Sequence, residues 1–99
     1  MYDLRFTKQA VKDAVKINHS GLKAKVDEII VTVQKNPYED SQGFEILKYD
    51  LKGACSRRIS QQHRFVYETL PNNEGLKDEN GEPYEGILKI ISMWTHYHE

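Results

Sequence analysis

A chain of 99 residues is long enough for one small domain, and we predict a single domain over residues 1–99. Hydrophobic residues at 38% and charged residues at 29% are ordinary for a globular protein. No apolar run approaches the roughly 18 residues of a membrane helix, so we expect no membrane partner. One cysteine, Cys55, cannot form an internal disulfide, and residues 1–10 do not read as a secretory signal, which favours a cytoplasmic location.

The net charge of -1 conceals an asymmetry along the chain. Residues 1–70 hold 12 Lys and Arg against 9 Asp and Glu, whereas residues 71–99 hold 2 against 6. A polyanion could still bind one face, because local potential rather than net charge steers charged ligands.

The first elements predicted are a strand and a helix. Bulky residues alternate over residues 2–6, which is typical of a short strand. Thr7 can then cap a helix that runs to about Asn18. The helical spacing predicts an apolar stripe made of Val11, Ala14 and Val15.

A second helix is predicted from a cap at Ser20 to about Lys35. It ends there because Pro37 cannot continue a helix and disfavours helical geometry at Asn36. Its apolar stripe consists of Leu22, Val26, Ile29, Ile30 and Val33.

From Phe44 onward the pattern has a period of two. It predicts strands at about residues 45–49, 54–60, 63–70 and 87–94. Gln61 and Gln62 form the turn of a hairpin, and residues 70–86 have the composition of a long loop with a tight turn at Asn80. The last strand is apolar on both alternations, so we expect it to be central and covered on both faces.

Two helices followed by a run of strands predict an α+β fold. The helices should pack on one face of an antiparallel sheet, which would leave the other face open for binding.

Charged side chains are concentrated in the predicted sheet. Strand pairing can bring Glu45 and Lys48 close to basic residues of the next two strands, which are Arg57, Arg58, His63 and Arg64. The planar fork of arginine suits phosphate oxygens, whereas the alternative is an exposed ion-pair ladder of little energy. Whether Arg57 faces a ligand stays open, because neighbours on a strand point to opposite sides.

The C-terminal residues raise the question of a metal site. His96, His98 and Glu99 could ligate zinc, but the pattern lacks cysteines and any H-E-x-x-H context. We therefore predict no metal and no cofactor.

The order of these motifs resembles the YoeB/Txe group of the RelE superfamily of toxins. The matching motifs are E-x-x-K from Glu45, L-x-G from Leu51, S-R-R-I-x-x-x-H-R-x-V-Y over residues 56–67, and Y-H at Tyr97. The resemblance covers most of the chain, including two amphipathic helices before the sheet.

The resemblance implies a RelE-like fold with a curved, mainly antiparallel sheet of four to five strands. It implies a ribosome-dependent mRNA endoribonuclease, an mRNA interferase that inhibits translation by cutting mRNA in the ribosomal A site without a metal. The implied partners are a cognate YefM/Axe-like antitoxin, the 70S ribosome and mRNA, with a toxin dimer as a further possibility.

The resemblance also assigns roles to residues. Glu45 would be the general base, Arg64 the phosphate clamp and His98 the general acid. The residues expected to bind RNA or its phosphates are Lys48, Arg57, Arg58, His63 and Tyr97.

Two features depart from the family pattern. Glu99 stands where close relatives end in tyrosine, and the loop over residues 70–86 is longer than their hairpin turn. The alternative hypothesis is therefore a catalytically weakened RelE-fold module that acts by binding the antitoxin or the ribosome. Lys8, Lys12 and Lys16 line one helix face, either as a solvated stripe or as contacts to RNA phosphates.

Overall fold

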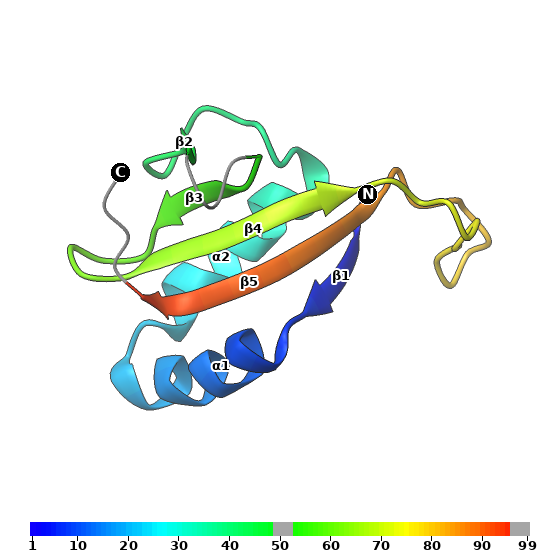
Figure 1. Cartoon of the computed structure of the whole chain (residues 1–99). Helices are drawn as coiled ribbons and strands as arrows, with labels where there is room; N and C mark the ends of the chain where they lie inside the picture. The colour runs from blue at the N-terminus through cyan, green and yellow to red at the C-terminus, as the bar shows by residue number, and fades with distance from the viewer. Residues whose placement is uncertain (49–52, 96–99) are drawn as a thin grey trace.

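The computed structural model describes residues 1–48 and 53–95 (Figure 1). In chain order the elements are β1 Asp3–Phe6, α1 Lys8–Ser20, α2 Lys23–Lys35, β2 Glu45–Ile46, β3 Cys55–Arg58, β4 Arg64–Leu70 and β5 Ile87–Thr95. Within these residues, no helix is both long enough and apolar enough to cross a membrane.

The strands form one five-stranded sheet in the order β1-β5-β4-β3-β2. Strand β1 runs parallel to β5, and the other three pairings are antiparallel. Both helices lie on the same side of the sheet, with α2 behind β4 in the view of Figure 1. The structure confirms the predicted α+β class, the helices on one face and the mainly antiparallel sheet.

Helix α1 begins where the sequence predicts, because the Thr7 hydroxyl accepts a hydrogen bond from the amide of Ala10 at 3.0 Å. Of the predicted apolar stripe, Ala14 packs against the core, but the prediction is wrong for the two valines. Val11 and Val15 are each 55% exposed, and α1 instead buries a face that includes Asp13 and Ile17.

The burial of Asp13 explains which face of α1 turns inward. Strand β5 holds one extra residue relative to β4 at two places between Ile90 and Thr95, so its ladder is interrupted there. The amides of Met93 and Trp94 donate instead to one carboxylate oxygen of Asp13, at 2.9 and 3.3 Å. The helix therefore presents a polar side chain to the sheet because β5 has unpaired amides to satisfy.

Helix α2 buries Val26, Ile29 and Val33 and ends at Lys35 before Pro37, both as predicted. The predicted cap at Ser20 is wrong. Ser20 is the last residue of α1, where its hydroxyl donates to the Ile17 carbonyl at 2.8 Å. Gly21, which has a left-handed φ of 79°, ends α1 and separates the two helices.

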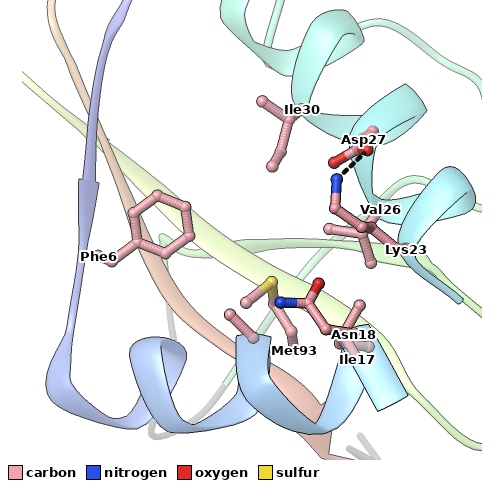
Figure 2. Close-up of a pocket in the computed structure, with 9 residues that line it drawn as sticks. Phe6, Ile17, Asn18, Lys23, Val26, Asp27, Ile30 and Met93 are labelled. Carbon is pink, nitrogen blue, oxygen red and sulfur yellow. Dashed lines mark hydrogen bonds and ion pairs between the residues drawn. The ribbon is translucent and has the colours of Figure 1, made fainter. Parts of the chain in front are cut away.

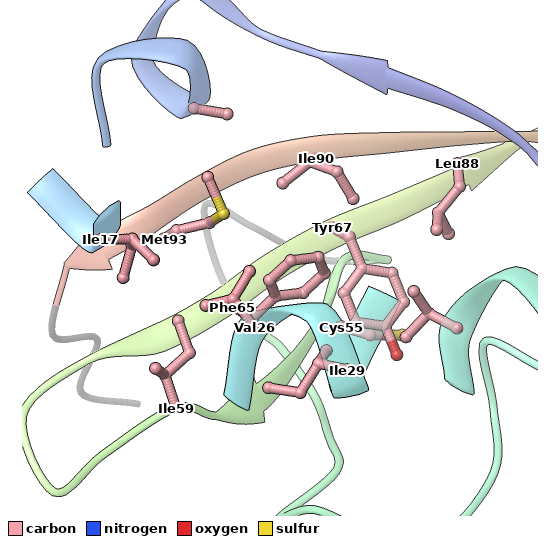
Figure 3. Packing of buried hydrophobic residues seen from close by; sticks show 12 residues of the cluster. Ile17, Val26, Ile29, Cys55, Ile59, Phe65, Tyr67, Leu88, Ile90 and Met93 are labelled. Atoms are coloured by element: carbon pink, nitrogen blue, oxygen red, sulfur yellow. The ribbon is translucent and has the colours of Figure 1, made fainter. Parts of the chain in front are cut away.

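The main core fills the space between the helices and the sheet (Figure 3). Its fully buried members include Ile17, Ile29, Phe65, Tyr67, Leu88, Ile90 and Met93. A second, smaller cluster of Leu47, Ala54 and Val66, with Ile91 packed against it, lies on the opposite face. The face opposite the helices is therefore partly covered rather than fully open, and β5 packs on both sides.

The acidic loop forms a small hairpin of its own. Lys77 and Pro83 pair as an isolated antiparallel bridge, and Gly81 occupies the predicted turn with a φ of 80°. In Figure 1 this segment projects beyond the sheet at the end opposite the β3–β4 turn. Its negative charge is thus kept away from the start of β4.

Candidate active site

The structure brings Glu45 and Arg64 together, although they are 19 residues apart in the sequence. Glu45 of β2 lies opposite Ser56 of β3, and Ser56 lies opposite Val66 of β4. An Arg64 Nη2 atom is 3.8 Å from a Glu45 carboxylate oxygen. The predicted base and clamp therefore share the face of the sheet that turns away from the helices.

The guanidinium of Arg64 is held by two further contacts. Its Nε donates to the Ser56 hydroxyl at 2.9 Å, and its Nη2 donates to the Gly43 carbonyl at 2.6 Å. Only 11% of the Arg64 side chain is exposed, whereas 54% of the Glu45 side chain is exposed. Its Nη1 makes no hydrogen bond within residues 1–48 and 53–95, so this group can donate to an incoming anion.

Strand alternation sets which side chains of β3 reach this site. Ser56 faces Arg64, and Arg58 starts from the same side of the strand because it is two residues further on. Cys55 and Arg57 point to the helices instead. Burial raises the pKa of the Cys55 thiol, and the opposing effect of the Arg57 charge on this pKa is smaller. Cys55 is therefore a core residue and not a nucleophile.

Arg57 is fully buried and forms a polar network under the loop that precedes β2. Its Nε donates to the Tyr67 hydroxyl at 3.0 Å. Its terminal nitrogens donate to the carbonyls of Pro37, Glu39 and Ser41 at 3.2, 2.6 and 2.9 Å. A phosphate cannot reach this guanidinium in the folded protein, so the structure does not support the prediction that Arg57 binds RNA.

The Arg57 network fixes the loop that delivers the active-site groups. The guanidinium carbon lies 5.0 Å from the centre of the Phe44 ring, between Gly43 and Glu45 in sequence. Burial raises the pKa of Tyr67 to about 12 against the opposing effect of Arg57, and its neutral hydroxyl donates to the Pro37 carbonyl at 2.5 Å. Loop and strand are therefore held in one arrangement by neutral acceptors around a buried cation.

The other predicted RNA-binding residues are dispersed. Arg58 is exposed and lies against Gly43, where an added Cβ would stand 3.1 Å from the Arg58 Cβ. Lys48 is exposed just beyond β2. His63 stacks on Trp94 at 3.9 Å between ring centroids, so it packs against β5 rather than beside Glu45.

The buried Nδ1 atom of His63 has no hydrogen-bond partner in the described part of the chain.

The predicted acid His98 and the predicted contact Tyr97 lie outside the described residues, as do His96 and Glu99. Their roles stay predictions. In the ranges that the structure describes, no group of three or more His, Cys, Asp and Glu could hold a metal ion.

Ser56 and Gly43 are the site residues that the sequence analysis missed. The sequence carries a signal for Ser56, because it alternates with Cys55 and Arg57 along β3, and the apolar Ile59 continues the Cys55 and Arg57 side just after the strand. It carries little signal for Gly43, whose contribution is a backbone carbonyl at the end of a loop.

A separate hollow of about 160 Å³ lies between β1, α1 and α2 (Figure 2). Phe6, Ile30 and Met93 point into it, and the ion pair of Lys23 with Asp27, at 2.7 Å, stands at its side. Its largely apolar lining cannot stabilise the charge of a reacting phosphate, so we do not assign the chemistry to it.

Solved structures show the class to which this fold belongs, that of the RelE-superfamily toxins. A YoeB/ParE toxin from Agrobacterium tumefaciens matches over 96% of this chain and 99% of its own, with a TM-score of 0.75 and 25% identity. The toxin in a YoeB-YefM complex from Staphylococcus aureus matches over 98% of this chain and 99% of its own, with a TM-score of 0.70 and 28% identity.

The family follows from the sequence. The profile described as YoeB-like toxin of bacterial type II toxin-antitoxin system matches residues 6–97, and the chain belongs to this family. Toxin YoeB of Escherichia coli O6:H1 is 44% identical over 43 residues, which cover 43% of this chain. That alignment spans only about half, 51%, of the length of the curated relative.

Proposed function

We propose that the chain is a ribosome-dependent mRNA endoribonuclease that cleaves translated mRNA in the ribosomal A site. The observation that carries the proposal is the anchored Arg64 guanidinium 3.8 Å from the exposed Glu45 carboxylate. Membership of the YoeB-like toxin family supports the choice of RNA as substrate.

The proposed reaction is a metal-independent transphosphorylation with the 2'-hydroxyl of the substrate as nucleophile. Glu45 takes the proton of that hydroxyl, which forms a bond to phosphorus while the bond to the 5'-oxygen breaks. Arg64 stabilises the charge of the phosphorane through its Nη1, because its other nitrogens are already held by Ser56 and Gly43. His98 is the proposed donor of a proton to the leaving 5'-oxygen. The products are a 2',3'-cyclic phosphate and a 5'-hydroxyl.

The proposed partners follow from the family rather than from the geometry. The Staphylococcus aureus YoeB has been solved both in a complex with YefM and as a dimer. We propose a YefM/Axe-like antitoxin as the partner that neutralises this chain, the 70S ribosome and mRNA as its targets, and the cytoplasm as its location.

A catalytically weakened module of the same fold is the second candidate. The sequence feature that favours it is Glu99, a carboxylate where the family resemblance implies a tyrosine. Such a protein would act by binding the antitoxin or the ribosome without cutting mRNA.

Expression in growing bacteria separates the two candidates. The nuclease arrests growth and cuts mRNA within translated codons, and Glu45→Gln or Arg64→Ala relieves the arrest while the protein stays folded. Arrest that survives both substitutions without mRNA cleavage would favour the weakened module. Circular dichroism and urea unfolding of each variant check the fold.

A further inference from the structure

A polar hollow of about 260 Å³ is lined in part by Gly43, whose carbonyl holds Arg64, and of its charged lining residues only Arg58 is given a role by the family resemblance. Its lining comes from the first turn of α2, the loop before β2, and the end of β3 with its turn. The residues that bear on its chemistry are Lys25, Gly43, Arg58, Ser60 and Gln61.

The hollow carries positive charge. Lys25 and Arg58 line it, and among the described residues no carboxylate does. Glu28 pairs with Lys25 at 3.6 Å, but 63% of the Glu28 side chain is exposed, and a solvated pair of this kind is weak. The Arg58 side chain makes no ion pair or hydrogen bond within the described ranges, so its five N–H donors are available to an anion.

Ser60 supplies a neutral donor to the same hollow. Its hydroxyl oxygen accepts hydrogen bonds from the amides of Gln62 and His63, at 3.2 and 3.1 Å. These bonds fix the oxygen while leaving the hydroxyl proton free to donate. A tetrahedral oxyanion would thus meet two cations and one hydroxyl donor from three different elements.

The hollow and the active site share Gly43. The Gly43 carbonyl accepts from Arg64 at 2.6 Å, while the residue itself lines the hollow against the Arg58 side chain. Arg58 and Arg64 are also directly opposite each other in the β3–β4 ladder. A strand of linked anions that passes Arg64 would therefore reach the hollow next.

We propose that this hollow, formed around Lys25, Arg58 and Ser60, binds a phosphodiester group of the RNA adjacent to the linkage held by Arg64. The identity of the ligand rests on the proposed function, whereas the affinity of the hollow for phosphate oxygens rests on its own side chains. Its contribution is to position the strand, and it reads no base.

The first test is a nuclear magnetic resonance titration with a fully 2'-O-methylated RNA hexanucleotide, whose blocked 2'-oxygens prevent cleavage. The amide signals of Gly43, Ser60 and Gln61 should shift in the wild-type protein, and these shifts should be lost in Lys25→Gln/Arg58→Gln. If inorganic phosphate alone shifts these signals and the oligonucleotide does not, the hollow is a site for a free anion and the RNA proposal is overturned. Unshifted signals with both probes also overturn it.

The second test is the salt dependence of hexanucleotide binding. The slope of log K against log salt concentration is negative, and loss of one phosphate contact to a single strand reduces its magnitude by about 0.7. We expect this decrease for Lys25→Gln and no decrease for the matched control Lys77→Gln, which removes a charge in the projecting hairpin. Equal slopes for the two variants would contradict the proposal.

Cleavage on the ribosome keeps the two proposals distinguishable. If the wild-type protein cuts mRNA and Lys25→Gln binds the hexanucleotide like the wild type, only the subsite fails. If the wild-type protein does not cut mRNA but the hexanucleotide still shifts the Ser60 signal in a Lys25-dependent way, the subsite stands and the proposed nuclease function fails.

Discussion

Arg57 and Arg64 sit on neighbouring strands, carry the same guanidinium and face opposite sides of the sheet. On the helix side, Arg57 donates to one phenol and three backbone carbonyls and has no exposed surface. On the other side, Arg64 donates through two nitrogens to Ser56 and Gly43, and its Nη1 next to Glu45 makes no hydrogen bond to any residue that the structure describes. An arginine has a structural role when the protein supplies acceptors for all of its guanidinium nitrogens. It can bind a ligand when one of these nitrogens has no acceptor in the protein.

The two arginines are also connected through one loop. Arg57 holds the carbonyls of Glu39 and Ser41, and the same loop then presents the Gly43 carbonyl to Arg64. The buried residue therefore prepares the geometry that the exposed site uses. Substitutions at the two positions should separate stability from activity.

The largest expected effect is that of Arg57→Ala on stability. The substitution leaves several carbonyls and the Tyr67 hydroxyl without their donor, at about 1–3 kcal/mol for each buried group, so the free energy of unfolding should fall by about 3 kcal/mol or more. Urea unfolding measures it. A loss below about 1 kcal/mol would show that the network does not hold the loop.

Arg64→Ala should show the opposite behaviour. Removal of a preorganised donor to a developing anion should lower the cleavage rate by about 10²- to 10³-fold. The free energy of unfolding should fall less than it does for Arg57→Ala, by about 1–2 kcal/mol, because only the Ser56 hydroxyl and the Gly43 carbonyl lose a donor and the ion pair with the exposed Glu45 is weak. An unfolded Arg64→Ala protein, or one with full cleavage activity, would remove the distinction between the two sides.

Asp13→Ala tests whether the helix side also controls the course of β5. The amides of Met93 and Trp94 would lose their acceptor, and the free energy of unfolding should fall by about 2 kcal/mol. Amide hydrogen exchange at these two residues should accelerate relative to Ile90. Unchanged exchange would show that another acceptor replaces the carboxylate.

The smallest expected effect is an alkaline one at Tyr67. Its pKa is raised by burial from the ordinary value of 10.0 to about 12, so the folded state favours the neutral phenol. The resulting stabilisation is fully present below pH 10 and is lost as pH rises towards about 12. The free energy of unfolding of Tyr67→Phe should lack this loss, and parallel curves for the two proteins would contradict the assignment.

Much of the fold is predictable from local chemistry. The Thr7 cap, the stop before Pro37 and the turn at Gly81 follow from backbone constraints that depend on few neighbours. The inward face of α1 does not, because it depends on amides that β5 leaves unpaired 80 residues away from Asp13 in the chain. Hydrophobic periodicity predicts that Val11 and Val15 are buried and that Asp13 is exposed. The opposite burial becomes apparent only once β5 is in place.

The candidate site was predictable in its residue types but not in their division of labour. Pairing of strands brings Glu45 and Arg64 together as the motif order suggested. The structure does not support the assignment of Arg57 to RNA. An arginine usually lies at the surface, and the burial of Arg57 depends on the carbonyls of a loop that no local pattern predicts. Gly43 likewise contributes a backbone carbonyl, which its residue type does not reveal.

The most direct test of the account is single-turnover cleavage of mRNA on programmed 70S ribosomes, with analysis of the product ends. The wild-type protein should yield a 2',3'-cyclic phosphate and a 5'-hydroxyl, and Glu45→Gln should form these products at least about 100-fold more slowly while retaining its fold. Cleavage by Glu45→Gln at the wild-type rate, or products that carry a 5'-phosphate, would contradict the claim that Glu45 and Arg64 form the catalytic centre.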